Sequence, residues 1–257
     1  MLRPGGFGAL PDITKNLLII NGLGFLATLA FKFGFDVSLV RNLGLYLPSS
    51  ANFEPYQVVT HLFMHGSLIH IFFNMFALFM FGSVLEQVLG SQRFFTYYIV
   101  AGFGAAALYM GVNYLESLSV YQDLVAAGVS KSNLTALQNA TTRQELQGVL
   151  GGINNLSAGV RDEVISLYRS YNIPTVGASG AVYGLLAGFG LLFPNTSIYL
   201  YFLFPIKAKY LVIGAGAIEL YSQLTAGPDD NIAHLAHLGG MLFGFLLLRI
   251  WGIQRFN

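Results

Sequence analysis

The chain has 257 residues, of which 54% are hydrophobic and only 10% are charged. Because a soluble domain carries about 25% charged residues, this composition excludes an ordinary water-soluble protein and indicates a helical protein that spans a membrane several times. The net charge of +1 offers no basic face to a nucleic-acid partner, and the absence of cysteine excludes disulfides, a thiol nucleophile and cysteine metal ligands.

Six apolar segments follow one another, each close to the ~20 residues that cross the hydrocarbon core. We expect membrane spans near residues 15–34, 66–88, 92–114, 177–193, 207–224 and 233–251. The first could be mistaken for a signal peptide, but it lacks a convincing small-residue cleavage site, so we expect a retained helix. Six spans place both ends of the chain on one side of the membrane.

The basic residues predict which side this is. With the amino terminus inside, the short outer loops contain only Lys32 and Arg41. The inner loops and tails contain Arg3, Lys15, Arg93, Lys207, Lys209, Arg249 and Arg255. The positive-inside rule therefore predicts cytoplasmic termini, and we expect an integral multi-pass protein of the bacterial inner membrane.

Residues 115–174 form a polar segment between the third and fourth spans. Apolar residues recur there at helical spacing, at Leu134, Leu137, Leu146, Leu150, Val160, Val164 and Leu167. We expect a small water-facing helical insert, with a disordered linker as the alternative. The chain then divides into residues 1–114 with three spans and an outer loop, the insert, and residues 175–257 with the last three spans.

The five histidines are the first candidates for chemistry. They form two groups, one of His61, His65 and His70, and one of His234 and His237. Ionisable groups at membrane depth are costly and therefore suggest function. Asn74 follows His70 by one helical turn and shares its face. For His61, His65 and His234 the sequence indicates no role beyond structural polar contacts.

Ser179 begins the fourth span in the sequence Gly177-Ala178-Ser179-Gly180. Spans four and six run in the same direction, and at the helical rise Ser179 and His237 both lie roughly 10 Å below the outer surface. Small residues let such helices approach closely, here Gly177, Gly180, Gly184, Gly240 and Gly244. We therefore expect a serine–histidine pair. The alternative is a serine that only packs between helices.

Such a pair is the minimum for serine acyl transfer, because a hydroxyl is a poor nucleophile until a base such as His237 accepts its proton. Spans four and six contain no acidic residue, so we expect the usual third carboxylate to be missing. Tyr183, one turn after Ser179, would orient the imidazole by packing instead. The donors available to an oxyanion are His70, Asn74 and the Ser179 amide.

A metal site is a competing hypothesis, since the histidines recur at i, i+4 and i, i+3. The chain lacks the His-Glu-x-x-His motif of membrane zinc proteases, and acidic ligands are almost absent from its spans. We therefore expect no metal and no cofactor.

In these motifs the chain resembles the rhomboid intramembrane serine proteases, over nearly all of its length outside the insert. The resemblance implies a six-helix rhomboid-like bundle with Ser179 as nucleophile. His237, followed at +3 and +7 by Gly240 and Gly244, matches the family's histidine, and His234 does not. The resemblance also implies an orienting role for Tyr183. His70 and Asn74 match its oxyanion element, and Glu86 fits a polar position at the inner end of span two.

The function implied is that of an endopeptidase that uses a Ser–His dyad to cut transmembrane helices of membrane proteins within the lipid bilayer, near its outer face. No nucleic-acid partner is implied. The alternative is a non-catalytic rhomboid-like protein that binds membrane-protein clients. Two features depart from the family's pattern: residues 36–60 lack its Trp-Arg pair, and the insert is much longer than the usual loop.

Overall fold

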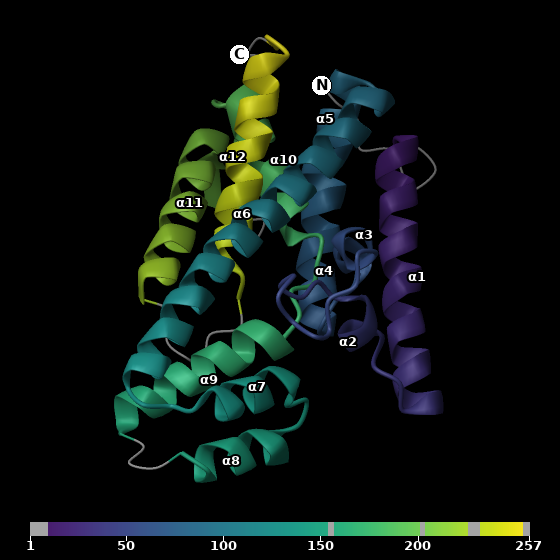
Figure 1. Ribbon diagram of the computed structural model, residues 1–257. Coiled ribbons are helices and arrows are strands. Elements are labelled where there is room, and N and C mark those ends of the chain that lie inside the picture. The colour runs from purple at the N-terminus through teal and green to yellow at the C-terminus, as the bar shows by residue number, and fades with distance from the viewer. Residues whose placement is uncertain (1–9, 154–156, 201–203, 226–231, 254–257) are drawn as a thin grey trace.

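The computed structural model describes residues 10–153, 157–200, 204–225 and 232–253. They form a bundle of long helices with a layer of shorter helices across one end (Figure 1). This confirms the predicted all-α membrane architecture. The long helices are α1 (Asp12–Phe35), α4 (Leu68–Ala77) continued by a π-helical turn η3 (Leu78–Gly82) and α5 (Ser83–Leu89), α6 (Ser91–Ala126), α10 (Ser179–Leu192), α11 (Ala208–Thr225) and α12 (His234–Ile250).

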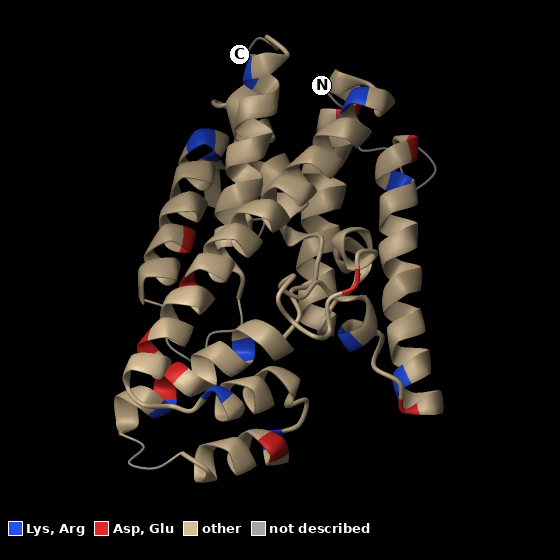
Figure 2. Cartoon of the chain, viewed as in Figure 1, with Lys and Arg blue, Asp and Glu red and all other residues tan. Residues whose placement is uncertain are grey.

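Each long helix covers one predicted span, but their lengths differ. By length and composition, α1, the Leu68–Leu89 run and α6 could cross a membrane, whereas α10 and α12 are shorter apolar helices. The number of six crossings therefore stays a prediction. α1 begins and α12 ends at the same end of the bundle (Figure 1). Most charged residues lie toward the two ends of the molecule (Figure 2), as expected for helices with an apolar middle.

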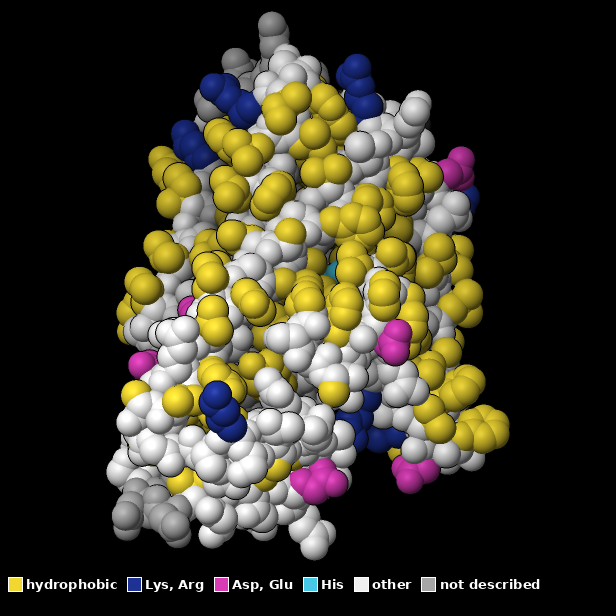
Figure 3. All heavy atoms as spheres, viewed as in Figure 1, with side chains coloured by type: hydrophobic (Ala, Val, Ile, Leu, Met, Phe, Trp, Pro, Cys, Tyr) yellow, Lys and Arg dark blue, Asp and Glu magenta, His cyan; other side chains and the backbone are white. Residues whose placement is uncertain are grey.

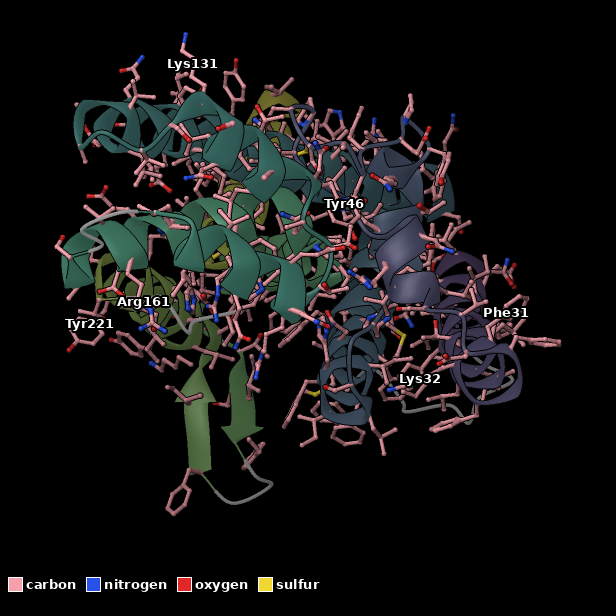
Figure 4. All side chains as sticks on the ribbon, turned by 60° about the horizontal axis from the view of Figure 1, so that its bottom comes forward. Phe31, Lys32, Tyr46, Lys131, Arg161 and Tyr221 are labelled. Atoms are coloured by element: carbon pink, nitrogen blue, oxygen red, sulfur yellow. The ribbon has the colours of Figure 1, made fainter. Side chains whose placement is uncertain are left out.

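Shorter elements connect the long helices. They are α2 (Leu39–Leu43), α3 (Gln57–Thr60), a 3₁₀ turn η2 (His61–Phe63), α7 (Lys131–Asn139), α8 (Arg143–Gly151), α9 (Ala158–Asn172), β1 (Ser197–Leu200) and β2 (Phe204–Lys207). The two strands pair antiparallel, with Ser197 opposite Lys207. Their hairpin projects from the bundle in Figure 4. It joins α10 to α11 and was not expected from the sequence.

Helix α10 lies in the interior, packed between α6 and α12. Its glycines make this possible, because a Cβ added at Gly240 would lie 1.8 Å from the carbonyl oxygen of Gly180. Farther along, the Tyr97 hydroxyl of α6 donates a 2.7 Å hydrogen bond to the carbonyl of Gly184. The two helices that carry Ser179 and His237 are therefore held in backbone contact.

The insert is helical, as its apolar spacing predicts. α6 continues past residue 114 into this layer without a break. The insert has its own core, which consists of Leu124, Val129, Leu134, Leu137, Val164, Leu167 and Tyr171. Lys131 projects outward from α7 in Figure 4, as expected for a water-facing layer.

The insert is tied to the outer loop between α1 and α4. The Ser50 hydroxyl donates to the Tyr171 carbonyl at 2.5 Å, and the Arg41 guanidinium donates to the Thr141 carbonyl at 2.6 Å. These bonds join segments that are about a hundred residues apart in the chain. The insert is thereby fixed against the outer loop, whose residues 45–47 line the same cleft as Ser179.

Glu86 is a buried carboxylate at the opposite end of the bundle. Its oxygens accept hydrogen bonds from the backbone N–H groups of Ile13 and Thr14, at 2.9 and 2.7 Å, and from the hydroxyls of Thr14 and Ser91. The first N–H groups of a helix have no partner within it, and a negative charge there is favourable. Glu86 therefore caps the N-terminus of α1 and links this helix to α5.

Replacing Glu86 by Gln is expected to lower the free energy of unfolding by about 2 kcal/mol, because the charge and an acceptor at the start of α1 are lost. Thermal unfolding in detergent measures this. The control is Glu145→Gln, which alters an exposed capping box on α8 and should have a smaller effect, because water replaces its bonds. Equal melting temperatures for Glu86→Gln and the wild type would contradict this role.

Candidate active site

Ser179 is the first residue of α10, and the turn before it determines where it lies. Gly177 adopts a φ of 119°, which other residues rarely adopt, and its N–H donates to the carbonyl of His61 at 2.9 Å. A Cβ at this position would lie 2.7 Å from the His70 ring. Gly177 was expected among the helix-packing glycines. That expectation is wrong, because the residue precedes α10 and packs under His70.

His237 lies in the first turn of α12 and faces Ser179. Its Nε2 is 2.9 Å from the Ser179 Oγ, which is hydrogen-bond distance. The ring of Tyr183 stacks on the imidazole with 4.2 Å between centroids and 7° between planes. Ser179 and Tyr183 are one turn apart on α10, so one helix presents the hydroxyl and the surface on which the histidine rests.

Glu219 of α11 is a site residue that the sequence did not predict. It is 6% exposed, and one of its oxygens, Oε2, lies 3.0 Å from the His237 Nδ1 and 2.5 Å from the His234 Nδ1. The other oxygen accepts a short hydrogen bond from the Tyr183 hydroxyl. The expectation that no carboxylate lies beside His237 is therefore wrong, because the acid comes from a helix other than α10 or α12.

A signal for Glu219 was present in the sequence. It is the only acidic residue between positions 207 and 224, and a carboxylate within a span is a functional candidate by default. Its partner could not be assigned from spacing, because α11 and α12 are separate helices. The contact depends on how they pack.

The two predicted oxyanion donors, His70 and Asn74, lie on α4 and line the same cleft as Ser179. Asn74 is 5% exposed, and its amide donates to the His70 carbonyl at 2.9 Å. This leaves its second amide hydrogen for another acceptor. The Ser179 N–H begins α10 and has no intrahelical acceptor. These groups could together surround a negatively charged oxygen.

The cleft has a volume of about 930 Å³ and is walled by several elements. Besides α4, α10 and α12, its lining includes Leu45, Tyr46 and Leu47 of the outer loop, Ser166, Arg169 and Ser170 of α9, and Ile173, which directly follows α9. A small area of histidine surface is visible among hydrophobic side chains in the middle of the face shown in Figure 3. The insert therefore forms part of the approach to Ser179.

Two further histidines lie before α4. The His61 Nδ1 is 2.9 Å from the Gln57 carbonyl oxygen, a local structural contact. His65 is buried with its ring edge toward His70, and among the described residues its ring nitrogens have no hydrogen-bond partner. Burial, with the nearby His70, lowers the pKa of His65 to about 4. Its imidazole is therefore neutral at ordinary pH.

Glu219, His234 and His237 also have the composition of a metal site, since their ligand atoms lie within 4.8 Å of one another. The distances argue against one. Two ligands of a tetrahedral zinc ion are about 3.3 Å apart, given bond lengths near 2.0 Å, but the His234 Nδ1 is 2.5 Å from the Glu219 Oε2. Among the described residues, Glu219 is instead hydrogen-bonded to Tyr183 and His234, with the His237 Nδ1 3.0 Å from its Oε2.

Comparison with known proteins gives one consistent result. The profile of the Rhomboid domain matches residues 52–147 and 146–253. Rhomboid-like protein 15 of Arabidopsis thaliana is 24% identical over 214 residues, which cover 75% of this chain and 51% of that protein. RHOMBOID-like protein 12, mitochondrial, of the same plant is 25% identical over 229 residues, which cover 89% and 55%.

A bacterial relative gives a similar match. The Putative rhomboid protease YdcA of Bacillus subtilis is 25% identical over 212 residues, which cover 80% of this chain and 69% of that protein. The chain spans about half the length of the two plant relatives.

Proposed function

Because the chain belongs to the rhomboid family, we propose that it is an intramembrane serine endopeptidase that cleaves transmembrane helices of other membrane proteins. The observation that carries the proposal is the 2.9 Å contact between the Ser179 hydroxyl and the His237 Nε2. The protease name of a relative such as YdcA is consistent with it. The activity and the residues that perform it are our inference.

In the first half of the reaction, the Ser179 Oγ attacks the carbonyl carbon of the scissile peptide bond, and its proton passes to the His237 Nε2. The carbonyl oxygen becomes an oxyanion, for which the Ser179 N–H, Asn74 and His70 are the available donors. When the C–N bond breaks, His237 gives the proton to the leaving amine. An acyl ester on Ser179 remains.

In the second half, water attacks the ester carbon and gives a proton to His237. The C–O bond to Ser179 then breaks, and His237 returns that proton to the serine oxygen. The new carboxylic acid leaves. Tyr183 stacks on the imidazole, so its contribution is to limit ring rotation while protons move in either direction.

Cleavage requires that the peptide bond of the substrate helix reach Ser179 in the cleft. A peptide carbon within an intact helix is shielded by its own backbone, so we propose substrates that unwind near the cut, with small or helix-breaking residues there. Since α9 lines the cleft, the part of the substrate outside the membrane would pass along the insert. No metal or cofactor has a place in this mechanism.

The protein is an integral membrane protein. We propose that the cleft opens to the outer face and that the termini lie on the cytoplasmic side, as the basic residues predict. The expectation of a bacterial inner membrane gains no support from the comparison, because several relatives carry mitochondrial names.

The proposal is tested with the purified protein in detergent and a fluorescent transmembrane peptide with small residues at its centre. Cleavage by the wild type is expected to fall to the detection limit in Ser179→Ala. Ser166→Ala, which makes the same change on α9 in the same cleft, should cleave normally. Undiminished cleavage by Ser179→Ala would overturn the proposal, and binding of the peptide without cleavage by the wild type would favour a non-catalytic protein.

A further inference from the structure

We propose that Glu219 is the positioning residue for His237, so that Ser179, His237 and Glu219 work together as a triad. The inference rests on the proposed function and adds a member on α11 that the Ser–His dyad does not contain. Its basis is the position of one carboxylate, which faces the imidazole nitrogen on the side away from the serine.

The proposed reaction requires one tautomer of His237. To accept the Ser179 proton, Nε2 must be unprotonated, so the ring hydrogen of neutral His237 has to be on Nδ1. The Glu219 Oε2 lies 3.0 Å from that nitrogen. A carboxylate there favours the required tautomer, and it favours the imidazolium that forms when the serine proton arrives.

Tyr183 and His234 hold the Glu219 carboxylate in a fixed position. The Tyr183 hydroxyl donates to Oε1, and the His234 Nδ1 lies 2.5 Å from Oε2. A buried carboxylate is stable only with such partners. Tyr183 therefore contacts both His237 and Glu219, since its ring stacks on the imidazole while its hydroxyl donates a hydrogen bond to the carboxylate. His234, for which the sequence indicated only structural contacts, therefore helps to hold the Glu219 carboxylate in place.

The contact between the Glu219 Oε2 and the His237 Nδ1 is close but imperfectly aligned. In the described part of the chain, the His237 Nδ1 has no hydrogen-bond acceptor in good geometry, although Oε2 is within 3.0 Å. Hydrogen bonds of this kind are commonly loose before substrate binds and tighten in the reacting complex. The nitrogen is buried, and among the described residues the Glu219 carboxylate is the anion that lies within hydrogen-bond distance of it.

The competing explanation is that Glu219 only fastens α11 to α10 and α12. A fastening residue affects how much protein is folded, whereas a positioning residue affects the rate of chemistry in the folded fraction. Glu86 provides the matched control, because it is also a buried carboxylate. It accepts four hydrogen bonds and lies toward the other end of the bundle.

The experiment compares Glu219→Gln, Glu219→Asp and Glu86→Gln with the wild type, with kcat and KM corrected for the folded fraction. Glu219→Gln is expected to lower kcat at least about 100-fold with KM changed less than threefold, because the charge behind the imidazole is lost. Glu219→Asp keeps the charge and should recover part of that loss. Glu86→Gln should lower the melting temperature and leave kcat within about twofold.

A second readout keeps the test decisive if Glu219→Gln folds poorly. The ¹⁵N shifts of His237, measured on the intact protein with labelled histidine, should report a proton on Nδ1 in the wild type and in Glu219→Asp. A kcat for folded Glu219→Gln within twofold of the wild type, or a wild-type proton on Nε2, would overturn the inference. Ser179→Ala in the same assay separates the two claims: if it cleaves normally, the proposed function fails as well.

Discussion

Replacing His237 by Gln is expected to lower kcat by about 10⁴-fold or more, while the protein remains folded. The imidazole is the only base within hydrogen-bond distance of the Ser179 hydroxyl among the described residues, and removal of the base in a serine hydrolase costs about as much as removal of the whole catalytic group. Glutamine is similar in size and polarity, so the packing of α12 should tolerate it. The cleavage rate of the transmembrane peptide measures the loss.

The control for this variant is His61→Gln, which replaces another buried histidine by the same residue. His61 makes a local contact to the Gln57 carbonyl and does not touch the pair. We expect lower thermal stability and a kcat within about threefold of the wild type. If His237→Gln cleaved the peptide as fast as His61→Gln, His237 would not be the base.

Replacing Gly240 by Ala is expected to abolish cleavage by a different route. The new Cβ would lie 1.8 Å from the Gly180 carbonyl oxygen, so α10 and α12 would have to separate. Overpacking of this kind costs about 3 kcal/mol or more when backbone atoms are in the way. The same displacement would lengthen the distance between Ser179 and His237, and a shift of about 1 Å can cost 10²-fold in rate.

Gly214→Ala on α11 is the matched control, because a Cβ there meets nothing within 4 Å. Alanine is the better helix former by about 1 kcal/mol, so this variant should unfold at the same or a higher temperature and cleave normally. Thermal unfolding and cleavage measured on both variants test the packing account. Normal cleavage by a fully folded Gly240→Ala would contradict it.

The sequence predicts the contact between Ser179 and His237, which lie 2.9 Å apart, because the features behind that prediction can be read from helical spacing. Ser179 and Tyr183 lie one turn apart on α10, and the expected spans place His237 at a similar depth on a helix that runs the same way. Glycines at helical intervals indicate that the two helices touch. The expected membrane depth of the two residues, the helix faces on which they lie and the close approach of the two helices therefore predict that Ser179 lies opposite His237.

The parts that the sequence did not predict depend on tertiary contacts. Glu219 reaches His237 from a third helix, and no spacing along the chain connects them. In the sequence Gly177 looks like another of the helix-packing glycines of span four. Its φ of 119°, which places it in a turn before α10, is a property of the folded chain. The β1–β2 hairpin depends on pairing between two short segments, for which single-residue preferences are weak.

The most direct test of the account is the site of covalent labelling by a serine-reactive fluorophosphonate. Intact protein in detergent is treated with the probe, digested, and the adduct is located by mass spectrometry. We predict a single modified residue, Ser179, with no labelling of Ser179→Ala and labelling of His237→Gln at least about 10³-fold slower, because the hydroxyl then lacks its base. An adduct on another serine, or equal labelling of Ser179→Ala, would contradict the assignment of Ser179 as the nucleophile.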